Sequence, residues 1–93
     1  MRVVWTQLAR DRLDEIFDFI GANSALRAAE FCERLIDAVD QLKVHPFSGP
    51  VLPEDPAYRQ LVVDEYRIAY RVGEDVVSIH TIVAPGMTYE HAL

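Results

Sequence analysis

The sequence lacks a pair of cysteines and any long apolar run. Its single cysteine, Cys32, cannot form a disulfide within the chain, which is compatible with a reducing cytoplasm. No hydrophobic stretch approaches the roughly 20 residues that cross a bilayer. The first ten residues become charged too early for a secretion signal. We therefore expect a cytoplasmic protein with neither a membrane span nor a disulfide framework.

Positive charge is also scarce, because 9 Lys and Arg stand against 15 Asp and Glu, which gives a net charge of −6. Such a field disfavours binding to phosphate backbones, so direct DNA binding by the chain alone is not expected. Nucleotide-binding glycine motifs, metalloprotease motifs and nucleophile elbows are missing. His45, His80 and His91 have no metal-ligand spacing. The sequence thus predicts no metal and no cofactor.

With 93 residues, the chain has room for one domain, residues 1–93. Residues 1–5 are rich in β-branched and aromatic side chains and predict a short strand. Thr6 and Ser24 are placed to cap two helices, and Gly21 to end the first helix in a left-handed conformation. The second helix should stop before the proline that follows His45. The short connection between the helices predicts an antiparallel hairpin.

Each predicted helix carries apolar residues at helical spacing. In the first helix they are Ala9, Leu13, Ile16, Phe17 and Ile20. In the second helix they are Ala28, Phe31, Cys32, Leu35, Ala38, Val39 and Leu42. We expect both rows to face the core.

The second half of the chain changes to an alternating pattern. Residues 45–57 hold four prolines and predict a stiff loop. Residues 58–63, 66–72 and 76–83 then predict a three-stranded antiparallel meander. The tail from residue 87 to 93 has no strong pattern, and a mobile or docking segment is the main expectation for it. The fold class is α+β, with the order β-α-α-β-β-β.

Tight turns at residues 64–65 and 74–75 fix a register for this meander. It sets Val63 opposite Tyr66, Val72 opposite Val77, and Ile68 opposite Thr81. The face expected to pack on the helices comprises Leu61, Val63, Tyr66, Ile68, Tyr70, Val72, Val77, Ile79 and Val83. The opposite face collects Tyr58, Gln60, Arg67, Arg71, Ser78 and His80.

Three segments resemble the ParE branch of the ParE/RelE toxin superfamily. They are residues 9–20 (ARDRLDEIFDFI), residues 42–49 (LKVHPFSG) and residues 58–72 (YRQLVVDEYRIAYRV), and they are similar to the opening helix, the helix exit and the sheet hairpin of that family. The resemblance covers about residues 1–83. It departs from the family at residues 81–86 (TIVAPG), where many members end the last strand with His and Arg.

The resemblance implies the toxin of a type II toxin–antitoxin system that stabilises plasmids and inhibits growth. ParE-type members inhibit DNA gyrase, whereas RelE-type members cleave messenger RNA on the ribosome. A cognate antitoxin typically wraps a disordered segment around the toxin, so a hetero-oligomer is expected. The acidic total and the missing basic end favour the gyrase hypothesis over RNA cleavage. A third hypothesis is a non-toxic module that only binds its partner within a repressor complex.

Arg67 and Arg71 lie four residues apart on one predicted strand face and predict an anion-recognition patch, although a solvated face that covers apolar neighbours is the plain alternative. In a ribonuclease they would stabilise the phosphate, with His80 as acid or base. Tyr89 and His91 would approach the patch if the tail folded back. The expected target- or antitoxin-binding set on the sheet is Tyr58, Arg59, Gln60, Arg67, Arg71 and His80.

An antitoxin helix needs an apolar groove on the helical hairpin. Four apolar residues fall outside the two core rows, and we expect them to form this groove: Leu8, Phe19, Leu26 and Ile36. Scattered surface hydrophobic residues, which are common, are the equal alternative.

Overall fold

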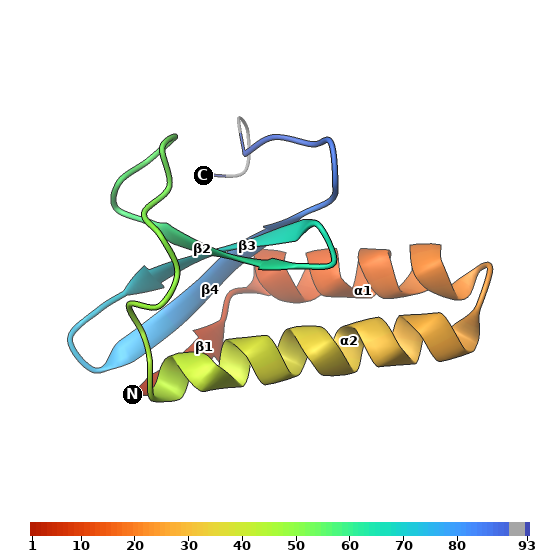
Figure 1. The fold of residues 1–93 in the computed structure, drawn as a ribbon, viewed down its shortest axis with the longest axis horizontal. Coiled ribbons are helices and arrows are strands. Elements are labelled where there is room, and N and C mark those ends of the chain that lie inside the picture. The colour runs from red at the N-terminus through yellow and green to blue at the C-terminus, as the bar shows by residue number, and fades with distance from the viewer. Residues whose placement is uncertain (90–92) are drawn as a thin grey trace.

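The structure is a computed structural model that describes residues 1–89 and residue 93. In Figure 1 a sheet lies in the middle, a helical hairpin covers one of its faces, and a loop and the C-terminal tail cover the other. No helix in the described part is long and apolar enough to cross a membrane. The elements in chain order are β1 (Arg2–Trp5), α1 (Gln7–Gly21), α2 (Ala25–Asp40), a 3-10 turn η1 (Gln41–Lys43), β2 (Arg59–Val63), β3 (Tyr66–Val72) and β4 (Val76–Val83).

Both helices begin where the sequence predicts. The Thr6 Oγ1 accepts the Ala9 N–H at 3.1 Å, and the Ser24 hydroxyl accepts the Arg27 N–H at 3.2 Å. Each bond satisfies one N–H that the first helical turn leaves without a partner. Gly21 ends α1 as predicted, but the left-handed conformation expected for it was wrong, because the chain continues in right-handed geometry through Ala22. The left-handed glycine is Gly86 instead.

The two helices form the expected antiparallel hairpin, and their apolar rows meet the sheet. Ile16, Phe31 and Leu35 are buried in the main core. Phe17 is a correction, since its side chain is 43 % exposed. It lies next to Ile16 in sequence, and a helix turns by about 100° per residue, which takes it off the buried stripe.

The sheet has the order β1-β4-β3-β2, with β1 parallel to β4 and the other pairs antiparallel. The meander of β2, β3 and β4 confirms the predicted chain order. The position of β1 was not predicted. Arg2 to Trp5 pair with Val76 to Ile79, more than 70 positions away, and local periodicity does not report such a distant pairing.

The predicted register holds in the first hairpin, where Val63 pairs with Tyr66, and at the start of the second, where Val72 pairs with Val77. It fails beyond Ile79, because a β-bulge shifts β4 by one residue against β3. Ile68 consequently pairs with Ile82 and not with Thr81. A bulge adds one residue to one strand, and this reverses the faces of the residues that follow.

The bulge also divides the apolar residues into two cores on opposite sheet faces. The main core lies under the helical hairpin and contains Ile82. Val83 was predicted there but is buried in a second, smaller core on the other face. That second core consists of Leu52 from the loop, Ala69, Val83 and Tyr89 from the tail, with Tyr58 packed against it.

Candidate protein-binding surfaces

Three of the predicted site residues meet on the outer face of the sheet, the face turned away from the helices. The Tyr58 and His80 rings lie with centroids 5.1 Å apart. The Arg71 guanidinium carbon lies 6.0 Å from the Tyr58 centroid. Arg71 is exposed, while Tyr58 and His80 are half-buried. The cluster offers a cation and two aromatic faces to a partner, a combination that suits protein recognition.

Arg59 does not belong to this cluster. It pairs with the core residue Tyr70, so its side chain leaves the opposite side of the sheet. Its guanidinium donates to the Gly49 carbonyl at 2.8 Å and lies 5.1 Å above the Phe47 ring. Arg59 therefore holds the loop after η1 in place.

Arg67 lies on the outer face, but its guanidinium is engaged within the chain. Nη2 donates to the Met87 carbonyl at 2.6 Å, and Nη1 lies 3.6 Å from the Glu54 carboxylate. The guanidinium carbon also stands 4.6 Å from the Tyr89 ring centroid. The predicted arginine pair is thus split, because Arg71 is exposed while Arg67 ties loop, strand and tail together.

The tail corrects the main expectation of a mobile or docking segment as far as Tyr89. This residue is 1 % exposed, and its hydroxyl donates to the Gln60 Oε1 at 3.2 Å. Burial raises the pKa of Tyr89 to about 12, with the Arg67 cation opposing and the Glu54 carboxylate adding to the shift. His91 lies outside the described residues.

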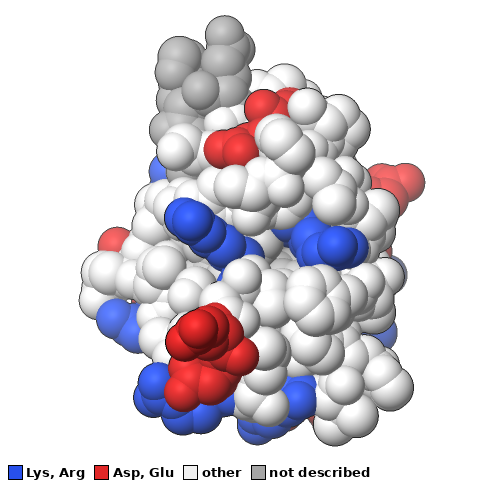
Figure 2. Space-filling model, turned by 90° about the vertical axis from the view of Figure 1, so that its left-hand side faces the viewer, with Lys and Arg blue, Asp and Glu red and all other residues white. Residues whose placement is uncertain are grey.

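Figure 2 shows the end of the molecule that carries the turn between β3 and β4. Lys and Arg side chains form separate groups near the middle and along the lower edge of this face, and Asp and Glu side chains lie above and between them. Two strongly exposed apolar residues, Val44 (73 %) and Phe47 (63 %), belong to the loop after η1. Charges of both signs are interspersed here, so this end does not form a continuous basic strip of the kind that binds nucleic acid.

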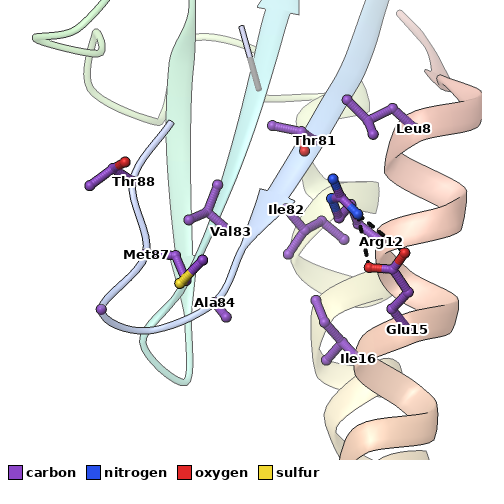
Figure 3. A pocket seen from close by; sticks show the side chains of 11 residues that line it. Leu8, Arg12, Glu15, Ile16, Thr81, Ile82, Val83, Ala84, Met87 and Thr88 are labelled. Carbon is purple, nitrogen blue, oxygen red and sulfur yellow. Dashed lines mark hydrogen bonds and ion pairs between the residues drawn. The ribbon is translucent and has the colours of Figure 1, made fainter. Parts of the chain in front are cut away.

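A second surface is a cavity of about 600 Å³ beside the last residues of β4. Figure 3 shows α1 on one side of it and the C-terminal tail on the other. Arg12 bridges to Glu15 at 2.9 Å on the helix side. The other lining residues are mostly apolar: Leu8, Ile16, Thr81, Ile82, Val83, Ala84, Gly86, Met87 and Thr88.

The backbone of β4 is open at this cavity. β1 ends at Trp5, which pairs with Ile79, and the Thr6 hydroxyl then donates to the His80 carbonyl at 2.8 Å. Within residues 1–89, positions 81–83 have β3 on one side and no strand on the other. An open strand edge is a template for an additional strand.

Thr81 lines this cavity and is fully buried, and its hydroxyl has no hydrogen-bond partner among the described residues. A buried hydroxyl without a hydrogen-bond partner lowers the free energy of unfolding. The sequence analysis assigned Thr81 no role. No local signal was available, because the β-bulge that places Thr81 opposite Ala69 and the pairing of β1 with β4 are not reported by periodicity.

The four apolar residues predicted to form a groove do not all meet. Leu8 lines the cavity. Phe19 is 73 % exposed and lies on the same face of α1 one turn beyond Glu15, as the spacing of four residues requires. Leu26 and Ile36 are exposed on α2 and are not part of the lining.

Cys32 is half-buried on α2. Burial raises the pKa of its thiol, and the nearby Asp14 carboxylate acts in the same direction. The thiolate is therefore disfavoured at neutral pH, and Cys32 is a poor nucleophile.

The comparisons with known proteins agree with this architecture. Residues 3–86 match the family described as ParE toxin of type II toxin-antitoxin system, parDE. The chain belongs to the ParE toxin family. It is also similar to a chain of the solved structure titled "Chromosomal ParDE TA system from P. aeruginosa", with a TM-score of 0.80 and 22 % identity over 91 % of this chain and 96 % of that chain. At this identity the likeness shows the ParE fold alone. No curated protein matches the sequence.

Proposed function

We propose that this ParE-family chain stops growth by binding and inhibiting DNA gyrase, and that a cognate antitoxin neutralises it. The observation that carries the proposal is the family match over residues 3–86. We place the activity in the cytoplasm and in plasmid stabilisation, in keeping with the family resemblance and with the lone cysteine, Cys32.

The engagement of Arg67 favours a binding mechanism over RNA cleavage. Cleavage would need cations directed at a phosphate and a base near the 2′-hydroxyl. Here Arg67 is paired with Met87 and Glu54, which leaves Arg71 as the exposed arginine beside His80. One exposed arginine and an imidazole packed against Tyr58 suit contacts with a protein better than an attack on RNA.

The antitoxin would occupy the cavity between α1 and the tail. An extended segment would pair with the open edge of β4 at positions 81–83, and an apolar side chain would fill the space beside Leu8 and Ile82. Main-chain hydrogen bonds then supply affinity, and side-chain pockets supply specificity. This binding would give a hetero-oligomer of toxin and antitoxin.

The test of the target uses the full chain, expressed from an inducible promoter and also purified with its antitoxin removed. Growth arrest with a DNA-damage response and intact transcripts, together with inhibition of supercoiling by purified gyrase, is the expected result. Cut transcripts with normal supercoiling would instead support the RelE-like ribonuclease. Normal growth together with antitoxin binding would leave only the partner-binding module.

A further inference from the structure

The tail crosses the outer face of the sheet as an ordered strap, which we define as residues 84–89. Its first step is a turn in which the Met87 N–H donates to the Ala84 carbonyl at 3.0 Å, with Pro85 and the left-handed Gly86 between them. Proline followed by a glycine with positive φ is the preferred pair for a type II turn. The turn sends the chain back over β3, where Tyr89 enters the second core.

The contacts of this strap occupy the guanidinium of Arg67. With the strap closed, its guanidinium donates to the Met87 carbonyl and lies against the Tyr89 ring. Both contacts come from the strap. The Glu54 contact comes from the loop and would remain if the strap left. At 3.6 Å between partly exposed groups, that ion pair is weak.

Arg71 lies on the same face of β3, four residues further along. At about 3.3 Å per residue the two arginines are separated by roughly 13 Å along the strand. That span fits two carboxylates on an extended peptide, whose alternate side chains recur at about 6.6 Å. The closed form offers one of these cations, whereas an open form offers both.

We propose that residues 84–89 are a displaceable strap, and that its opening converts the outer face into a two-arginine docking site for a carboxylate-bearing protein segment. Charge complementarity selects this partner, because the cations of Arg67 and Arg71 would both face it. Among the described residues, Glu54 is the acidic group that contacts Arg67. The proposal concerns this chain's own face and does not depend on whether gyrase is the target.

The test measures binding of a fluorescent poly-glutamate peptide to the full-length protein at low ionic strength. In the Tyr89→Ala variant the strap loses its buried anchor, and we expect binding at least about threefold tighter than in the unmodified chain. Combining Tyr89→Ala with Arg67→Gln should abolish the gain. Met87→Ala is the matched control, since its side chain is 62 % exposed and its carbonyl is retained.

Amide exchange at Met87 reports strap opening independently, because this N–H is bonded within the turn. It should accelerate in Tyr89→Ala and, to a lesser extent, in Tyr89→Phe, which removes only the bond to Gln60. The Tyr89→Phe variant keeps the aromatic ring, so amide exchange can be measured on it if Tyr89→Ala does not fold. Three results would each overturn the proposal. The strap could open without tighter binding of the peptide, the gain in peptide binding could survive Arg67→Gln, or amide exchange at Met87 could stay unchanged.

Discussion

Gly49 shows how a single residue is fixed by its surroundings. A Cβ added there would lie 2.2 Å from the Gln60 carbonyl oxygen and 2.8 Å from the Tyr70 hydroxyl. That hydroxyl also accepts the Gly49 N–H at 2.9 Å in a buried position. The loop after η1 therefore approaches the sheet more closely than any side chain at position 49 allows.

We expect Gly49→Ala to lower the free energy of unfolding by about 2–3 kcal/mol, because the backbone must move and strain the Tyr70 bond. Chemical denaturation measures the change. Gly21→Ala is the control, since its Cβ would meet only the Ala28 Cβ at an ordinary 3.7 Å. Equal effects at the two positions would show that the close contact is unimportant.

Thr81 presents the opposite case, a buried hydroxyl without a partner among the described residues. Thr81→Val should raise the free energy of unfolding by about 1 kcal/mol, since it removes the unsatisfied group and keeps the shape.

Thr6→Val should lower the free energy of unfolding by about 1–2 kcal/mol, because that hydroxyl caps α1 and also bonds to His80. Thermal unfolding of the two variants would decide, and a destabilised Thr81→Val would contradict this account.

At the scale of elements, the strap couples stability to alkaline pH through Tyr89. Its pKa is raised to about 12 in the folded chain, above the ordinary value of 10.0. Between these values the unfolded chain loses the phenol proton while the folded chain keeps it, so the unfolded state binds fewer protons and stability falls as pH rises. Below pH 10 the phenol is protonated in both states, so the stability that Tyr89 contributes is fully present.

We therefore expect Tyr89→Phe to remove a stability loss of up to about 2 kcal/mol between pH 10 and 12. The measurement compares urea unfolding of the two chains across that window, so that the other tyrosines and the lysine cancel. Parallel pH profiles would mean that Tyr89 is not buried in solution.

The elements also show what periodicity predicts and what it misses. The caps at Thr6 and Ser24 and the alternation from residue 59 onward are local signals, and they predicted the helices and the meander. The bulge at His80 has no local signal, and it reversed the faces of Thr81 and Val83. The roles of Arg59 and Arg67 depend on a loop and a tail that fold over the sheet, which spacing along a strand does not report.

At the scale of the whole molecule, exposure separates residues that stabilise the fold from residues available to partners. Phe19→Ser should change the free energy of unfolding by less than about 0.5 kcal/mol, because the side chain is 73 % exposed. If the antitoxin lies along α1, the same change should weaken its binding by about 1–3 kcal/mol.

Val44→Ser is the matched control, since Val44 is also 73 % exposed but lies in the loop after η1. Calorimetric titration of each variant with the antitoxin separates the two positions. Equal losses, or a larger loss at Val44, would place the antitoxin elsewhere.

The parallel pairing of β1 with β4 has a consequence for biosynthesis. Residues 2–5 are synthesised 74 positions before their partners at 76–79. Until then β1 has no ladder to join, and the main core lacks Val77, Ile79 and Ile82. Contacts this distant in sequence form late and slowly. A truncated chain that stops before β4 is therefore an incomplete fold, and the protein acquires its working surfaces only after β4 has been synthesised.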